Sequence, residues 1–264
     1  MKSPDGWTSD TVHTDGIELQ YYRTGYGPPL VLAHGFYNDS RCWTQLATDL
    51  ADEYEIVLYD ARGHGQSDGP ETGYAIENRV SDLVDLVTAL DLTDPILLGH
   101  SMGGSTVAWA AATYPDLPRA VVLEDPAGMY GDPEMGPDER ATTVREQVRD
   151  WEDQSVTDIA TDYTDREPKL ARRLAVADSE CSPHIAEIAR EGYPDLAEAF
   201  PQITCPALVL KADADPEQRA VDLDIAADLH DGRLVHIPQS GHCVFYDRYG
   251  AAYAELRTFF HRIS

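Results

Sequence analysis

The stretch with the clearest chemical potential is residues 95–104, PILLGHSMGG, which places a serine between two glycines. The apolar run at 96–98 predicts a buried strand, and the alanine-rich run at 106–113 predicts a helix that ends before Pro115. Ser101 therefore lies on a strand-to-helix turn, with Gly99 and Gly103 two positions away on either side. Such a turn exposes the serine hydroxyl at a helix N-terminus, where backbone N–H groups favour negative charge. The pattern predicts that Ser101 is a nucleophile.

A nucleophilic serine needs a base to remove its proton, and the base needs a carboxylate to orient it. In enzymes with this turn, the acid and then the histidine follow the serine along the chain. His242 fits the base because it lies in a loop, shortly after the strand predicted at 233–237. The other late histidines fall on predicted helix ends or inside a strand: His230, His236 and His261.

Three aspartates are candidates for the orienting carboxylate. The loop at 212–216 follows a predicted strand and precedes a predicted helix, which favours Asp215 and next Asp213. Asp125 ends the strand predicted just beyond the serine, and it stays open as an alternative acid. Aspartate is abundant along the whole chain, so only position in the fold separates the candidates.

A tetrahedral intermediate at Ser101 also needs backbone N–H donors for its oxyanion. One donor in such sites belongs to the residue after the nucleophile, which here is Met102, and the other comes from an earlier loop at a strand end. The sequence His34-Gly35-Phe36 is such a loop, so the Phe36 N–H is the second predicted donor. Loss of one donor in a comparable site slows the reaction ~10²–10³-fold. His34 precedes the serine, which favours a structural or hydrogen-bonding role for it.

The elements that position these residues alternate between strand and helix. Buried strands are predicted at 30–33, 55–60, 96–98, 120–125, 206–210 and 233–237, and helices intervene between most of them. This order predicts a parallel sheet built from βαβ units. Residues 129–200 lack a strand pattern and carry apolar residues at helical spacing. We therefore predict a core from 1–128 and 201–264, interrupted by a helical insertion at 129–200.

The motifs together resemble a known family. The matching pieces are HGF at 34–36, DARGHGQS at 60–67, GHSMGG at 99–104, Asp215 and the pair Gly241-His242. In order and spacing the chain resembles the α/β-hydrolase superfamily, and within it the cap-bearing serine hydrolases similar to carboxylesterases and lipases. The resemblance implies an eight-stranded, mostly parallel sheet with a helical cap, and a structural role for the turn at 60–67. One departure is Ala212, which stands where the family usually has glycine before its acid.

The net charge of −27 comes from 47 acidic against 20 basic residues spread along the chain. This charge produces a negative electrostatic potential around the protein, which repels nucleic acid and anionic membranes, so neither is expected as a partner. Evenly spread acid with scarce lysine resembles the proteins of salt-accumulating halophiles. The first residues lack the apolar core of a signal peptide, and no apolar run approaches membrane-spanning length, which predicts a cytoplasmic location.

The predicted function is hydrolysis of a small-molecule carboxylic ester through an acyl-enzyme on Ser101. The four cysteines form no C-x-x-C pair, and no phosphate loop or dinucleotide motif appears, so no metal and no cofactor are expected. Serine rather than aspartate at the turn argues against the dehalogenase and epoxide-hydrolase branches of the superfamily. A carbon–carbon bond hydrolase, a lactonase, a cofactor-free haloperoxidase and a ligand-binding receptor stay open, as do the substrate and the oligomeric state.

Overall fold

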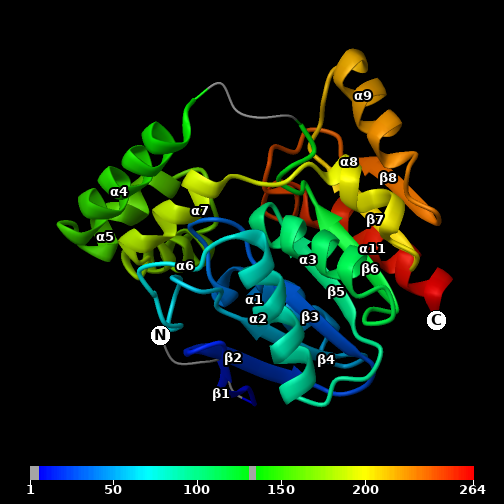
Figure 1. Cartoon of the computed structure of the whole chain (residues 1–264), viewed down its shortest axis with the longest axis horizontal. Helices are drawn as coiled ribbons and strands as arrows, with labels where there is room; N and C mark the ends of the chain where they lie inside the picture. The colour runs from blue at the N-terminus through cyan, green and yellow to red at the C-terminus, as the bar shows by residue number, and fades with distance from the viewer. Residues whose placement is uncertain (1–5, 131–134) are drawn as a thin grey trace.

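The computed structural model describes residues 6–130 and 135–264, and its centre is one eight-stranded sheet (Figure 1). The strands are β1 (Thr8–Thr14), β2 (Ile17–Gly25), β3 (Pro29–Ala33), β4 (Glu55–Tyr59), β5 (Ile96–His100), β6 (Ala120–Glu124), β7 (Ala207–Lys211) and β8 (Gly232–His236). Their order is β1-β2-β4-β3-β5-β6-β7-β8. Strand β2 pairs antiparallel with β1 and β4, and every other pair is parallel. The predicted eight-stranded, mostly parallel sheet is confirmed.

Both faces of the sheet are buried, because alternate residues of each central strand point into two separate apolar clusters. Val31 of β3 belongs to one cluster, while Leu30 and Leu32 on either side of it belong to the other. The same alternation runs along β4, β6 and β7. Strands covered on both faces are continuous apolar runs, which is why the sequence identifies them so directly.

Eleven helices among the described residues flank the sheet or stand beside it (Figure 1). They are α1 (Thr44–Leu50), α2 (Ile76–Ala89), α3 (Met102–Thr113), α4 (Pro137–Glu152), α5 (Val156–Ile159), α6 (Pro168–Ser179), α7 (Ala186–Glu191), α8 (Leu196–Ala199), α9 (Pro216–Ala226), α10 (Val244–Asp247) and α11 (Tyr249–Ile263). Helices α2 and α3 pack on one face, and α1 and α11 pack on the other. Short 3₁₀ turns are η1 (Ser40–Trp43), η2 (Ala160–Tyr163), η3 (Pro183–Ile185) and η4 (Phe200–Gln202).

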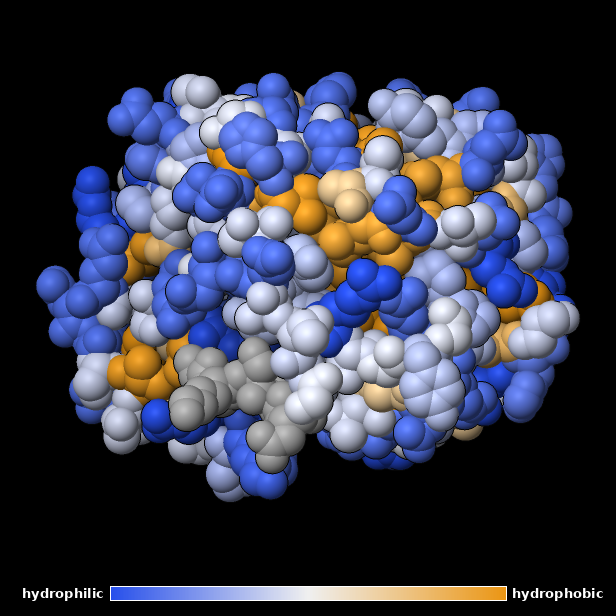
Figure 2. Space-filling model, turned by 90° about the horizontal axis from the view of Figure 1, so that it is seen from below, coloured by the Kyte–Doolittle hydropathy of each residue, from blue (hydrophilic) through white to orange (hydrophobic). Residues whose placement is uncertain are grey.

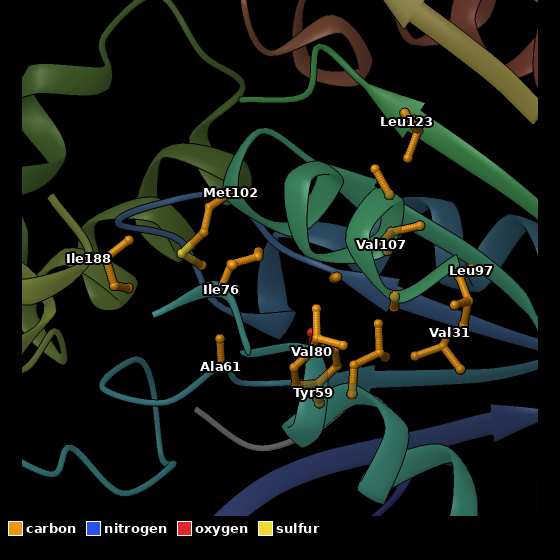
Figure 3. Close-up of a cluster of buried hydrophobic side chains, with 14 of the residues drawn as sticks. Val31, Tyr59, Ala61, Ile76, Val80, Leu97, Met102, Val107, Leu123 and Ile188 are labelled. Atoms are coloured by element: carbon orange, nitrogen blue, oxygen red, sulfur yellow. The ribbon is translucent and has the colours of Figure 1, made fainter. Parts of the chain in front are cut away.

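The segment between β6 and β7 contains only helical elements among its described residues. Helices α4 to α7 stand beside the sheet, whereas α8 and η4 return to pack against α3 (Figure 1). In Figure 3 the side chain of Met102 extends toward Ile188 of α7, and both residues belong to the same buried cluster. The core of the sheet therefore continues into the inserted helices.

Parallel pairing brings the chemically interesting residues to one edge of the sheet. Strands β3, β5, β6 and β7 all run in the same direction, so their carboxyl ends meet there. The residues that follow these ends are His34, Ser101, Asp125 and Ala212. The sheet thus assembles in space the loops that lie far apart in the sequence.

Candidate active site

Ser101 occupies a backbone conformation that side chains rarely adopt. Its φ of 50° and ψ of −111° place it in a strained left-handed turn between β5 and α3. Backbone hydrogen bonds fix the turn, because the Ser101 N–H donates to Glu124 O at 2.9 Å and its carbonyl accepts from Ala127 N at 3.0 Å. Strain of this kind persists only where the surrounding structure enforces it, and it is concentrated at functional sites.

The two glycines around Ser101 are required by space. A Cβ atom on Gly99 would collide with the carbonyl group of Gly103, and a Cβ on Gly103 would collide with the backbone at Ala33. Strand β5, helix α3 and the end of β3 therefore approach so closely that no side chain fits between them. The G-x-S-x-G spacing of the sequence is the consequence of this packing.

His242 forms its hydrogen bond with Asp125, at 2.6 Å between Nδ1 and Oδ2. The histidine side chain is 55% exposed, whereas the carboxylate is 11% exposed. A proton shared at Nδ1 leaves Nε2 as the acceptor, which is the state a general base needs. The backbone of the histidine is also held, because its carbonyl lies 3.1 Å from Nε2 of His100.

The expectation that Asp215 orients the histidine is wrong in this structure. Asp215 is the N-cap of α9, and its Oδ1 accepts from Gln218 N at 2.9 Å. Asp213 is also engaged elsewhere, since it accepts from Gln239 N at 2.7 Å and pairs with Arg219. Aspartate is one of the residues preferred at a helix N-cap, so an aspartate directly before a helix can be a cap and not a catalytic acid. Asp125, the alternative acid, takes the place beside the histidine.

Lys211 is a site residue that the sequence did not reveal. It is 4% exposed at the end of β7, and its ammonium group forms an ion pair with Oδ1 of Asp125. Burial alone would raise the pKa of Asp125, but the hydrogen bond from His242 and the Lys211 charge outweigh burial and lower that pKa to about 2. The carboxylate is therefore ionised whenever the enzyme is folded at neutral pH. The scarcity of lysine was the available signal, because Lys211 is one of three lysines in the chain and directly follows the apolar run at 207–210.

The predicted oxyanion donors lie in suitable elements. Met102 is the first residue of α3, so its N–H lies among the groups that have no carbonyl partner within the helix. Phe36 follows the end of β3 and lines the pocket that also contains His242. Their role as donors to an oxyanion stays a prediction. Both ring nitrogens of His34 have hydrogen-bond partners within the fold. Its Nε2 accepts from Ala61 N at 2.9 Å, and its Nδ1 lies 2.8 Å from Gly35 O.

A pocket of ≈ 420 Å³ opens beside the histidine. Its walls are Phe36, Asp125, Pro126, Ala127, Gly128, Met129, Tyr130, Arg140, Ala189, Gly192, Tyr193, Lys211 and His242. The inserted segment supplies several of these residues, and Met129 is among them. Trp151, on α4 of the inserted segment, does not line this pocket and packs edge-on against Tyr37, with ring centroids 5.0 Å apart. A larger cleft of ≈ 700 Å³ lies near α1 and α10, and its walls include neither Ser101 nor Asp125.

The described residues contain neither a candidate metal site nor a candidate membrane-spanning helix. Within residues 6–130 and 135–264, no group of three or more His, Cys, Asp or Glu side chains could hold a metal ion. In the same part of the chain, no helix combines the length and the apolar character that crossing a membrane requires.

The sheet order and the strained serine turn define an α/β hydrolase. A family model described as the alpha/beta hydrolase family matches residues 30–256, and the chain belongs to that family. The 3-oxoadipate enol-lactonase 2 of Acinetobacter baylyi is 28% identical over 233 residues, which cover 81% of this chain and 82% of that protein.

A second relative matches a shorter region more closely. The 2-(acetamidomethylene)succinate hydrolase of Mesorhizobium japonicum is 38% identical over 121 residues, or 46% of this chain. That alignment spans 44% of the relative, less than half of its length. The crystal structure of E-2-(acetamidomethylene)succinate hydrolase superposes with a TM-score of 0.80 and 25% identity, covering 97% of this chain and 99% of the other.

Proposed function

We propose that the protein is a serine hydrolase that cleaves a carboxylic ester through an acyl-enzyme on Ser101. The observation that supports it most strongly is the strained turn of Ser101 beside the His242–Asp125 hydrogen bond, at the same edge of the sheet. In this proposal, residues 129–200 are the cap that covers the site and shapes the acyl pocket.

The reaction follows from the roles of the three side chains. His242 Nε2 takes the Ser101 proton while the oxygen attacks the ester carbonyl, and the Asp125 carboxylate stabilises the imidazolium that forms. The Met102 and Phe36 N–H groups donate hydrogen bonds to the carbonyl oxygen as it becomes negatively charged. His242 then returns the proton to the leaving alcohol. Water activated by the same histidine hydrolyses the acyl-enzyme and restores Ser101.

Chromogenic acyl esters of increasing chain length test the proposal, assayed in molar KCl. Wild type should turn over one length class, while Ser101→Ala and His242→Ala should lose at least about 10³-fold in kcat and keep the fold. Trapping an acyl adduct on Ser101 by mass spectrometry identifies the intermediate. Full activity in either variant contradicts the proposal, and a folded wild type without turnover of any ester favours the receptor alternative.

A lactone is the second candidate substrate, because a lactone is a cyclic carboxylic ester and a relative that aligns over 81% of the chain is named 3-oxoadipate enol-lactonase 2. Arg140 and Lys211 both line the pocket, but Lys211 is paired with Asp125. Arg140 hydrogen-bonds only to backbone carbonyls among the described residues, so its positive charge would favour a substrate that carries a carboxylate group. Arg140 is fixed in the wall by donation to Ala189 O at 2.7 Å and Met135 O at 2.6 Å.

Matched substrate pairs separate these candidates. A lactone with a carboxylate should be opened with a lower KM than its methyl ester, and Arg140→Met should reduce that difference by about tenfold while kcat changes little. Arg172→Met, at an exposed position of α6, is the control. Equal KM values for the charged and neutral lactones in wild type would reject the anionic substrate but leave the ester hydrolase intact.

A further inference from the structure

The ammonium group of Lys211 is held between two side chains. On one side it forms the ion pair with Asp125 Oδ1, and on the other it lies 5.0 Å from the ring centroid of Tyr130. A cation at this distance is attracted by the negative face of an aromatic ring. The Lys211 side chain is 5% exposed, whereas Tyr130 is 49% exposed, so the tyrosine is the outer member of the contact. Because a lysine stem is flexible, the ring restricts the ammonium to its position against the carboxylate.

Tyr130 is itself fixed through its hydroxyl group, which donates to Asp222 Oδ1 at 2.6 Å. Asp222 also accepts from Gln218 Nε2 at 3.0 Å, and its Oδ2 lies 2.7 Å from His236 Nε2. Among the residues of α9, all of which the structure describes, Asp222 alone is buried. Burial by itself would raise the pKa of this carboxyl group, but the hydrogen bonds that it accepts outweigh burial and lower that pKa. Asp222 is therefore an ionised, well-fixed acceptor for the phenol.

Asp125 is the residue that this arrangement supports. Its φ of 38° lies in the left-handed region, where a residue with a side chain is strained. Its Oδ2 bonds to His242, and its Oδ1 pairs with Lys211 and lies 3.4 Å from Ala212 N. Among the described residues, Lys211 is thus the one side chain besides the histidine that holds the carboxylate. A displaced Lys211 would release Oδ1 and let the carboxylate rotate away from the imidazole.

We propose that Tyr130 is a positioning residue for Asp125 and acts through Lys211. Its anchored ring holds the ammonium against Oδ1, and the ammonium keeps Oδ2 aligned with His242. The inference rests on the proposed hydrolase function, in which Asp125 orients the general base. Tyr130 belongs to the inserted segment, so this segment contributes to the alignment of the acid. Tyr130 also lines the pocket, which makes direct contact with the substrate the competing role.

Single and double variants separate the two roles in a chromogenic ester assay. Tyr130→Leu should lower kcat by about fivefold with little change in KM, the factor expected for loss of one cation–π contact. Tyr130→Phe, which keeps the ring and loses the anchor, should lower kcat less. In the Lys211→Met background, Tyr130→Leu should have no further effect, because the side chain through which it acts is gone. Tyr114→Leu is the control, since Tyr114 is 44% exposed and lies outside the pocket walls.

The thermal midpoint gives a second measurement that needs no substrate. Burial raises the pKa of Asp125, and His242 and Lys211 together lower it to about 2, so a weaker contact with Lys211 lets it rise toward 3.8. A carboxyl group with a depressed pKa stabilises the fold above its unfolded pKa and loses that effect in acid. Tyr130→Leu should therefore lower the midpoint at pH 6 by about 2 °C, with the difference narrowing below pH 4.

In the Lys211→Met background, the same substitution should leave the pH dependence of the midpoint unchanged. The other titratable side chains close enough to interact with Asp125 are present in every variant and cancel in this comparison: His100, Glu124 and Cys243.

Two results would overturn the inference. One is a raised KM with unchanged kcat in Tyr130→Leu that persists in the Lys211→Met background, since Tyr130 would then bind the substrate. The other is a midpoint difference that is the same at every pH, because the tyrosine would then act through packing alone. A wild type that turns over no ester contradicts the proposed function instead, and the midpoint comparison still decides whether Tyr130 acts through Lys211.

Discussion

Asp125 is the carboxylate that hydrogen-bonds to His242, whereas Asp215 caps helix α9. Asp125→Asn should lower kcat by about 10⁴-fold, because an amide no longer stabilises the imidazolium of His242. Asp215→Asn should leave kcat unchanged, since asparagine still caps α9. Asp215→Ala should lower the free energy of unfolding by about 1 kcal/mol through loss of the cap. Steady-state kinetics and urea unfolding check all three, and a kcat defect confined to Asp215 would contradict the assignment.

Lys211 should control how the stability of the protein responds to acid. The folded-state pKa of Asp125 is about 2, below its ordinary value of 3.8. This depression stabilises the fold above pH 4 and is lost as the pH falls toward 2. Lys211→Met removes the cation, so the pKa of Asp125 should rise. The variant should be less stable than wild type at neutral pH, with the difference narrowing below pH 4.

Thermal unfolding across that pH range measures the effect. Lys169→Met, which removes an exposed lysine, should follow the wild-type curve. A difference in thermal midpoint between Lys211→Met and wild type that is the same at every pH would show that the lysine acts through packing alone.

At the scale of elements, Glu124 ties β6 to the segment that carries the histidine. Its Oε1 accepts from Phe245 N of α10 at 2.8 Å, and its carbonyl accepts from Ser101 N. Burial raises its pKa from 4.5 to about 8, although the hydrogen bond from Phe245 N opposes that change. The raised pKa means that its contribution to stability is complete below pH 4.5 and is lost as the pH rises through about 8.

Glu124→Gln should therefore flatten the decline in thermal midpoint between pH 4.5 and about 8, because the amide oxygen still accepts from Phe245 N but does not ionise. Glu124→Ala should lower the midpoint at every pH in that range through loss of the acceptor. Identical slopes for Glu124→Gln and wild type would place the pH dependence in other groups.

The inserted helices give a prediction about selectivity. Met129 lines the pocket and is 2% exposed, so Met129→Ala should enlarge the pocket that we propose binds the acyl group and move the preferred ester toward longer chains. The control is Met135→Ala, because Met135 is 40% exposed. Relative kcat/KM values along a chain-length series measure the shift. An unchanged preference in Met129→Ala would argue against the role of this segment in shaping the acyl pocket.

The central elements could be predicted because buried strands and tight turns constrain residue type strongly. Strands β3 to β7, the serine turn and His242 follow from apolar runs, glycines and chain order. Strand β1 was not predicted, because it is a polar edge strand in which only Val12 and Thr14 are buried. The sequence favoured Asp215 and Asp213 over Asp125 as the partner of His242. The choice among them depends on the positions of two loops, which the sequence does not specify.

At the scale of the whole molecule, the surface charge poses a stability problem. Hydrophilic side chains cover most of the face shown in Figure 2, and the net charge is −27. Surface ion pairs such as Arg257–Glu53 neutralise some of the carboxylates. Acidic residues nevertheless outnumber basic ones by 47 to 20, so most carboxylates have no cationic partner available. Exposed pairs contribute only about 0–1 kcal/mol each, so they do not offset the general repulsion.

Salt should therefore stabilise this protein. The screening length falls from ~10 Å at 0.1 M salt to ~3 Å at 1 M, which removes most repulsion between exposed carboxylates. Because native stabilities are only ~5–15 kcal/mol, a penalty of several kcal/mol in dilute buffer is decisive. The thermal midpoint and the hydrolase activity should rise together from dilute buffer to molar KCl. Potassium sulfate at equal ionic strength separates screening from salt exclusion, since exclusion adds further stability only in sulfate. Unfolding curves that stay flat across this range would contradict halophilic adaptation and leave an acidic enzyme whose charge has another cause.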